Sequence, residues 1–182
     1  MKKIGYCLLL IIFLFSLSSC VFEDEVIEKN FEYETHAVAQ TADRVYGFVT
    51  IDKVKYLYDK DSNYASVDSV GYDATDVVIK DSITVLDYTY KVTTIGSGSF
   101  DKCVAVKNIT IGRNVTTIKK EAFIYSYSLK EIIIPKNVTK AESYLFLNSN
   151  KDLKIYLEAK KLPTGFDKDF ASGYNFELGY SK

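Results

Sequence analysis

The sequence contains few side chains of the types that carry out catalysis or bind metals. His36 is its only histidine, and it lies in an acidic stretch near the N-terminus. A Ser-His-Asp site needs a histidine that a rigid scaffold holds in place, so we expect His36 to be solvated. No group of cysteines and histidines has the spacing of a zinc site. These residue types predict neither a catalytic site nor a metal site.

Two further features exclude other classes of ligand. The stretch GSGS, Gly96–Ser99, lacks the Lys and the Ser or Thr that complete a phosphate-binding loop, and a tight backbone turn explains its glycines. The formal net charge is −1, so the sequence shows no excess of positive charge for nucleic-acid binding. We therefore expect a protein that is not an enzyme and has no cofactor and no nucleic-acid partner.

The first twenty residues have the parts of an export signal. Lys2 and Lys3 supply positive charge, and the apolar run Cys7–Phe15 is shorter than the roughly 20 residues that cross a bilayer. The segment ends in LSSC, Leu17–Cys20, which resembles a bacterial lipobox. The resemblance implies that residues 1–19 are a lipoprotein signal peptide and that Cys20 is acylated. An ordinary secretory signal with an incidental cysteine is the alternative.

Acylation of Cys20 would hold the protein on a membrane of the bacterial cell envelope, exposed at the surface, because two acyl chains are enough for a stable anchor. Residues 20–44 are then expected to form an acidic tether, since segment 21–35 has six acidic side chains and one lysine. A partner-binding tail is the alternative interpretation of these charges. With Cys7 removed and Cys20 acylated, Cys103 is the remaining cysteine, and we expect it to be a small core residue.

The region 45–91 is rich in β-forming residues. VYGFVTI and KYLY, joined by DKV, predict an antiparallel hairpin, and Asp59–Asn63 predicts a polar loop. ASVDSV and DVVI predict further short strands, and ITVLDYTYKVTTI predicts a second hairpin that turns near Asp87 to Thr89. We assign residues 45–91 to N-terminal β-hairpins and a partial repeat.

Three consecutive 23-residue segments, 92–114, 115–137 and 138–160, align without a net gap. A repeat this short cannot bury its own apolar face, so copies must stack into a solenoid with continuous side-chain ladders. The third segment slips locally, because Leu153 stands one place later than Val106 and Leu129. The aligned apolar columns are Val92, Val115 and Val138; Ile95, Ile118 and Ala141; Phe100, Phe123 and Phe146; Ile109, Ile132 and Ile155; and Ile111, Ile134 and Leu157.

This pattern resembles the BspA-like leucine-rich repeats of bacterial surface lipoproteins, whose unit runs roughly V-x-x-I-G-x-x-A-F-x-x-C-x-x-L-x-x-I-x-I-P. Departures are Ser99 for Ala, Ser126 for Cys and Gly112 for Pro. The resemblance implies a mainly β fold, a short solenoid with one parallel strand per coil, preceded by antiparallel β-hairpins. It further implies that residues 74–83 are a partial unit, that residues 92–160 are three repeats, and that residues 161–182 are a C-terminal cap.

In leucine-rich repeats, the residue between the two ladders of a strand points outward. By alignment these residues are Val78, Thr110, Ile133 and Tyr156, which we call the outer column, and they are flanked by Asn108, Glu131 and Lys154. An exposed apolar column is typical of an interaction site, although β-propensity alone also explains these residue types. Tyr125 and Tyr127 are a second candidate contact, expected on the opposite side of their coil.

Together these observations predict a lipid-anchored, non-catalytic protein of the cell envelope that recognises an unknown protein ligand on the sheet face. The family resemblance implies surface proteins, some of which are associated with adhesion. A structural spacer, or an assembly subunit of an envelope complex, is the alternative function.

Overall fold

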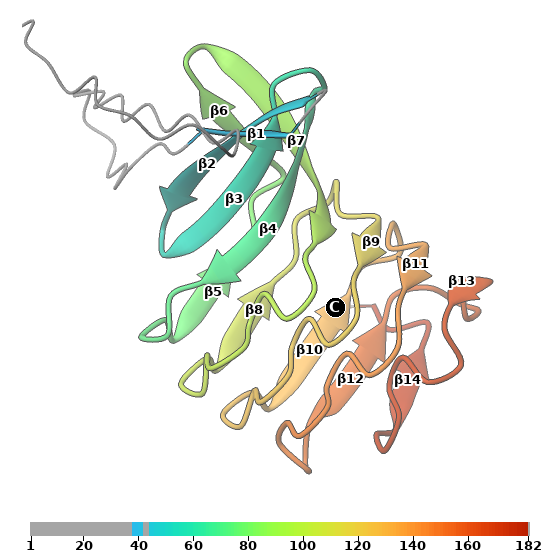
Figure 1. The fold of residues 1–182 in the computed structure, drawn as a ribbon. Coiled ribbons are helices and arrows are strands. Elements are labelled where there is room, and N and C mark those ends of the chain that lie inside the picture. The colour runs from blue at the N-terminus through green and yellow to red at the C-terminus, as the bar shows by residue number, and fades with distance from the viewer. Residues whose placement is uncertain (1–37, 42–43, 182) are drawn as a thin grey trace, which may run out of the picture.

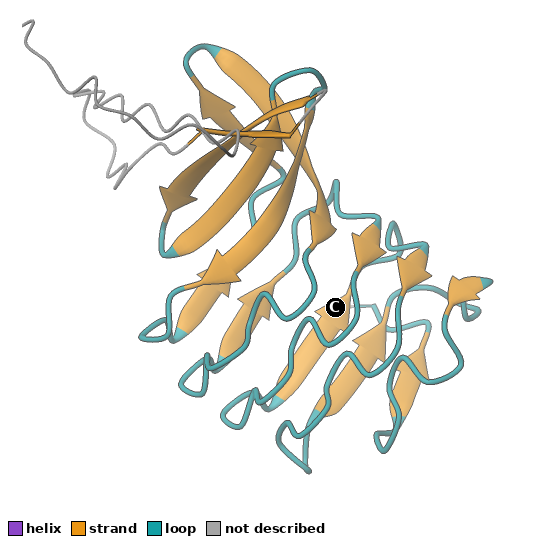
Figure 2. Cartoon of the chain, in the orientation of Figure 1, coloured by secondary structure: helices purple, strands orange, loops and turns teal. Residues whose placement is uncertain are grey.

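The computed structural model describes residues 38–41 and 44–181, and all of its regular elements are β-strands (Figures 1 and 2). Antiparallel hairpins come first, and a solenoid of stacked parallel strands follows. The predicted fold class is therefore confirmed. The expected signal peptide, Cys20, His36 and most of the expected tether lie outside the described residues.

The N-terminal part is an antiparallel arrangement whose strands alternate between buried and outward-facing residues. The first hairpin turns at Asp52 and Lys53, where φ is +51° and +66°, and Val54, Tyr56 and Tyr58 point into the core. The first four strands of this N-terminal part are β1 (Val38–Thr41), β2 (Arg44–Ile51), β3 (Val54–Asp59) and β4 (Tyr64–Val70). The predicted first hairpin is thus present as β2 and β3.

The second hairpin joins β6 (Ser82–Val85) to β7 (Tyr88–Ile95). Its turn is the pair Leu86 and Asp87, with φ of +49° and +68°, and Thr89 pairs with Thr84 inside the ladder. The expectation of a turn near Asp87 to Thr89 is therefore wrong by one to two residues. A two-residue turn with both φ values positive matches the twist of the strands it joins, so pairing resumes at once.

The solenoid consists of two parallel stacks of strands, to which successive coils contribute. In the first stack, Asp76–Val78 pairs with Asn108–Thr110, and the next three strands pair in chain order. The first stack contains β5 (Asp76–Val78), β8 (Asn108–Thr110), β10 (Glu131–Ile134), β12 (Lys154–Leu157) and β14 (Phe176–Leu178). The second contains the end of β7, then β9 (Thr117–Ile118), β11 (Lys140–Ala141) and β13 (Gly165–Phe166).

One sheet runs through both parts of the molecule. The order β1-β2-β3-β4-β7-β9-β11-β13 is continuous, because β4 pairs in parallel with β7 and β7 pairs in parallel with β9. The hairpins therefore cover the N-terminal end of the solenoid, and among the described residues this part of the sheet has edges at β1 and at β6, which pairs with β7 alone. The strands β13 and β14 extend both stacks beyond the third repeat.

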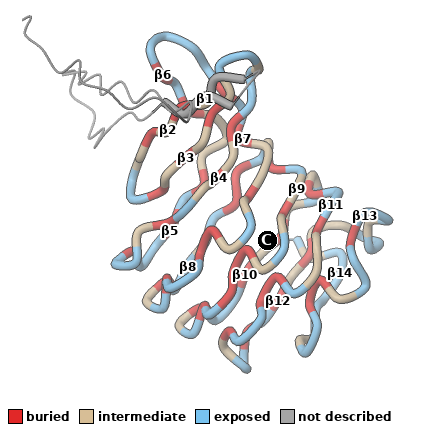
Figure 3. Tube along the Cα trace, in the orientation of Figure 1, coloured by how far each residue is buried: buried red, intermediate tan, exposed pale blue. Residues whose placement is uncertain are grey.

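The core lies between the two stacks of strands, and Figure 3 marks which segments of the chain are buried there. Phe100, Phe123 and Phe146 lie in a row, with ring centroids 5.1 and 5.4 Å apart. Val106, Leu129 and Leu153 are all buried, so the loop before β12 absorbs the one-residue slip of the third repeat. The burial of Ile132 and Phe123, at 1% and 0% exposure, confirms the prediction for both residues, whereas Ile109 in the column of Ile132 is only partly buried.

Backbone hydrogen bonds repeat with the same period as the ladders. The amide of Thr116 donates to the carbonyl of Thr93, and the amide of Thr139 donates to the carbonyl of Thr116, both at 2.9 Å. The amide of Phe123 likewise donates to the carbonyl of Leu145 in the next coil at 2.9 Å. Equivalent residues must therefore have equivalent backbone conformations, because each coil satisfies the polar groups of its neighbour.

The three departures from the repeat pattern have local explanations or costs. A Cβ at Gly112 would lie 2.6 Å from the carbonyl oxygen of Lys80, so only glycine fits between the first two coils. Ser99 and Ser126 are buried, and neither hydroxyl has a hydrogen-bond partner among the described residues. Burying a polar group without a partner is unfavourable, so these two serines are weak points of the core.

Cys103, Ser126 and Ser149 occupy the same position in successive repeats, but their side chains differ in their hydrogen-bond partners. The Cys103 thiol donates to the carbonyl of Val70 at 3.3 Å, and burial raises its pKa to about 11. It is an inert core residue, as a thiol with a raised pKa reacts slowly. The Ser149 hydroxyl donates to the carbonyl of Phe123 at 2.8 Å and accepts from the amide of Ser126 at 3.1 Å.

Truncation of either ladder residue, Ile132→Ala or Phe123→Ala, should lower the free energy of unfolding by about 2–5 kcal/mol. The reason is the lost apolar contact plus the cavity left between coils. Urea denaturation followed by circular dichroism measures this loss. The exposed Lys130 provides the control, since Lys130→Ala should change the unfolding free energy by less than about 0.5 kcal/mol. A similar small change for both ladder variants would contradict the repeat alignment.

Two of the buried serines, Ser126 and Ser149, should respond in different ways to replacement by alanine. Ser149→Ala leaves the amide of Ser126 and the carbonyl of Phe123 unpaired and should destabilise the protein by about 1–3 kcal/mol. Ser126→Ala removes a hydroxyl that has no partner, so it should be neutral or stabilising. Thermal denaturation of the two variants side by side tests this difference. Equal losses of stability would show that the Ser126 hydroxyl is satisfied after all.

Candidate functional site

The two stacks bring the outer column together from distant parts of the sequence. Val78 pairs with Thr110, and Ile133 pairs with Tyr156, each in a parallel register. The strand β8 lies beside β10, so the four residues follow one another in chain order across the face (Figure 1). Glu177 of β14 continues this row, since it pairs with Tyr156.

Exposure decreases along the outer column. Val78 is 54% exposed and Thr110 is exposed, whereas Ile133 and Tyr156 are only half-buried. The expectation that all four side chains point freely to solvent is therefore too strong for the last two. Tyr156 is partly covered because its ring lies 4.5 Å from that of Tyr180, centroid to centroid. Val78 and Thr110, whose strands lie nearest the N-terminal hairpins, are exposed, so the hairpins do not cover them.

Polar residues line one side of the column. Asn108 donates to the carboxylate of Asp76 in the neighbouring strand, and this hydrogen bond holds the pKa of Asp76 below its usual value. Glu131 and Lys154 are register partners on β10 and β12, so opposite charges face each other. Such pairs on neighbouring strands contribute modestly to sheet stability and add polar groups beside the apolar column.

A hollow of about 580 Å³ lies beside the outer column at the start of β8 and β10. Asn108, Glu131 and Tyr127 line it together with Lys107 and Lys130. From the sequence we expected Tyr127 on the opposite side of its coil. The structure shows that this expectation is wrong, because Tyr127 lines the same hollow as Asn108 and Glu131. The ring of Tyr125 lies 6.0 Å from that of Tyr127, centroid to centroid, so the two tyrosines form one aromatic pair at the edge of this hollow.

A second hollow, of about 330 Å³, lies where β12 meets β14. Lys154 and Tyr156 form one wall, and Tyr174, Phe176 and Glu177 form the other. Sequence reasoning missed this wall and Tyr180 because it treated residues 161–182 as a cap. The sequence could have indicated this wall, because the outer column continues from Tyr156 to Glu177 at a spacing shorter than the 23-residue repeat.

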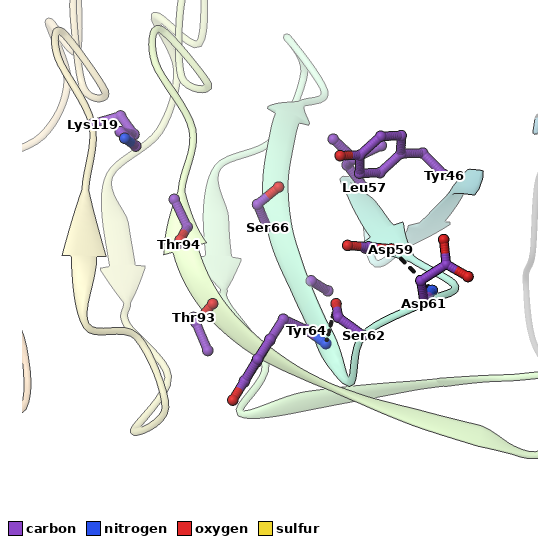
Figure 4. Close-up of a pocket in the computed structure, with 11 residues that line it drawn as sticks. Tyr46, Leu57, Asp59, Asp61, Ser62, Tyr64, Ser66, Thr93, Thr94 and Lys119 are labelled. Atoms are coloured by element: carbon purple, nitrogen blue, oxygen red, sulfur yellow. Dashed lines mark hydrogen bonds between the residues drawn. The ribbon is translucent and has the colours of Figure 1, made fainter. Parts of the chain in front are cut away.

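A third hollow, of about 830 Å³, lies on the outer face of the other sheet (Figure 4). Strands β2, β3, β4 and β7 form it, with Tyr46 and Leu57 on one side and Ser66, Thr93 and Thr94 across from them. Sequence reasoning missed it because its walls depend on the non-local pairing of β4 with β7. Its lining contains neither histidine nor cysteine.

The described residues contain no cluster of three or more His, Cys, Asp or Glu side chains that could bind a metal ion. No helix in the described ranges is long and apolar enough to span a membrane.

Comparison with known proteins agrees with the geometry. The BspA type leucine rich repeat region matches residues 77–165 in six copies. A leucine-rich repeat protein from Bacteroides ovatus has 24% sequence identity and a TM-score of 0.51, and the alignment covers 71% of this chain and 40% of that one. A second from Bacteroides capillosus has 22% identity and a TM-score of 0.43, with coverage of 67% and 99%. No curated protein matches the chain.

A leucine rich cell surface protein from Faecalibacterium prausnitzii is also similar, with 15% identity, a TM-score of 0.32 and coverage of 72% of this chain and 54% of that one. Proteins of the BspA type are often surface proteins that interact with other proteins, and their repeats are typically non-catalytic. The Bacteroides ovatus structure supports the solenoid fold alone. With its period, ladders and family match in agreement, the repeat array of this chain belongs to the BspA type leucine-rich-repeat family.

Proposed function

We propose that this protein is anchored by an acylated Cys20 at the bacterial cell surface and recognises another protein on its outer column. Two registers carry the proposal: β5 with β8 pairs Val78 with Thr110, and β10 with β12 pairs Ile133 with Tyr156. The strands β8 and β10 lie side by side, so the two pairs adjoin on one face. Neighbouring strands are about 4.8 Å apart, so the four side chains form one continuous strip.

The surroundings of the strip favour a protein as its ligand. The two hollows, of about 580 and 330 Å³, adjoin its flanking residues and Tyr156. Each is large enough for one or two side chains of a partner, and tyrosine is enriched where partners bind most strongly. Glu131 and Lys154 supply a polar rim of both signs, which is the usual composition around an apolar contact.

The anchoring part of the proposal depends on the sequence alone. LSSC follows a short apolar run, and the acidic segment that comes next would hold the repeat domain away from an anionic membrane surface. Adhesion to another cell or to a host surface is the biological role that suits this arrangement. This role is proposed because some family members are associated with adhesion. The argument depends on a shared fold and not on a shared binding site.

A structural spacer is the second candidate function. The continuous sheet from β2 to β13 favours it, because the hairpins and the coils share one hydrogen-bonded framework. Such a framework resists bending and would keep a fixed distance between its two ends. A spacer needs no specific contact on the outer column, and this separates the two proposals experimentally.

Replacement of the acylated residue, Cys20→Ser, should abolish incorporation of labelled fatty acid and leave the precursor uncleaved. A serine hydroxyl cannot replace the thiol that receives the diacylglycerol group. Metabolic labelling followed by electrophoresis measures both effects. Cys103→Ser is the control, because Cys103 is buried in the core and its loss should leave labelling unchanged. Undiminished labelling of the Cys20 variant would contradict lipid anchoring at this residue.

The double variant Val78→Asp and Tyr156→Asp should weaken binding of the partner at least tenfold, about 1.4 kcal/mol. It places charges at both ends of the strip. The partner is first identified by cross-linking on intact cells, and its affinity is then measured by titration against both proteins. Tyr88→Asp is the matched control, since Tyr88 is 68% exposed at the tip of the second hairpin. An unchanged affinity in the double variant would favour the spacer function.

A further inference from the structure

The last strand of the first stack exposes residues that continue the core. Phe176 pairs with Ile155, and Leu178 pairs with Leu157, so both occupy positions of the buried ladders. Ile155 and Leu157 are each 1% exposed, whereas Phe176 and Leu178 are 38% and 44% exposed. The coil that contains β14 therefore exposes apolar ladder residues to solvent. The terminal repeat of a solenoid normally has a polar outer face instead.

The backbone of β14 is also open on this side. β14 is the end strand of the hydrogen-bonded order β10-β12-β14 in the first stack, and within the described residues no strand pairs with its outer edge. An exposed apolar edge is a template for pairing with another strand. Whatever covers it must supply both a strand backbone and apolar side chains at alternate positions, as each coil does for the coil before it.

The arrangement of β14 is complementary to itself. Its sequence is Phe176, Glu177 and Leu178, with one apolar residue on each side of the glutamate. In an antiparallel pair of two such strands centred on Glu177, Phe176 faces Leu178 of the other copy, and both pairs lie on the core side. The contact has two-fold symmetry, so it closes and leaves neither edge open.

We infer that two copies of this protein associate through β14, which pairs antiparallel with β14 of the second copy about an axis through Glu177. The contact extends the established coil-to-coil interface, because the same two ladder positions are buried in the same way. It also joins the first stacks of both copies into one sheet, β12-β14-β14-β12. The two outer columns then lie on one continuous face.

The glutamates limit the strength of this contact. Glu177 of each copy lies directly opposite its equivalent on the outer face of the joined sheet, and like charges in this position are destabilising. Glu177→Gln should therefore tighten the dimer, by up to about fivefold in dissociation constant. Leu178→Lys should weaken it at least tenfold by placing a charge on the apolar side.

Disulfide trapping in the full chain on intact cells tests both the contact and its register. Glu177→Cys places two thiols across the axis, within the 7 Å between Cα atoms that a disulfide allows. Under mild oxidation we expect a covalent homodimer on non-reducing electrophoresis. Asn175→Cys is the matched control: Asn175 is also exposed, but its two copies would be about 13 Å apart and should stay monomeric.

Two further variants complete the test. Leu178→Lys in the Glu177→Cys background should remove the covalent dimer, and circular dichroism of the same protein shows whether it still folds. Glu177→Gln should shift the monomer–dimer equilibrium in sedimentation toward the dimer. Three results would each overturn the inference: no dimer from Glu177→Cys, equal dimer from Asn175→Cys, or a covalent adduct with a different protein only. None of these results depends on the ligand of the outer column.

Discussion

The stacking of side chains between neighbouring coils is the interaction on which the rest of the structure depends. A coil of about 23 residues has no interior of its own, so Phe123 is buried only because Phe100 and Phe146 lie on either side of it. The same holds for the backbone, since the amide of Phe123 finds its acceptor, the carbonyl of Leu145, in the next coil. Each coil is therefore both part of the core and a template for its neighbour.

The features of the outer surface follow from this constraint. Once Ile132 pairs with Ile155 and Ile134 with Leu157, the residues between them must line up on the opposite face of the strands. The outer column is thus a by-product of the core register, and its side chains are free to vary for recognition. The same logic explains the exposed Phe176 and Leu178, because within the described residues a ladder position in β14 has a neighbouring strand on one side only.

The period of the sequence was sufficient to predict the solenoid and its ladders, and the β-rich runs with short connections predicted the antiparallel hairpins before it. Phe123, Ile132 and Cys103 are buried as the pattern required. Features that depend on non-local pairing could not be predicted in this way. The parallel pairing of β4 with β7 joins the hairpins to the solenoid, and it brings together two of the strands that form the hollow in Figure 4. Tyr180 was missed for a related reason. Its contact with Tyr156 depends on how residues beyond the third repeat return to the stack, where the spacing of the repeat changes.

Native-state hydrogen exchange tests most directly whether the coils depend on one another. The amides of Phe100, Phe123 and Leu145 each donate across a coil boundary, to the carbonyls of Ala122, Leu145 and Phe170. If ladder stacking holds the array together, these three amides should exchange through one common opening, with the same free energy and the same dependence on denaturant. Opening that proceeds one coil at a time, with clearly different free energies for the three amides, would show that the coils are stable independently and would contradict this explanation of the fold.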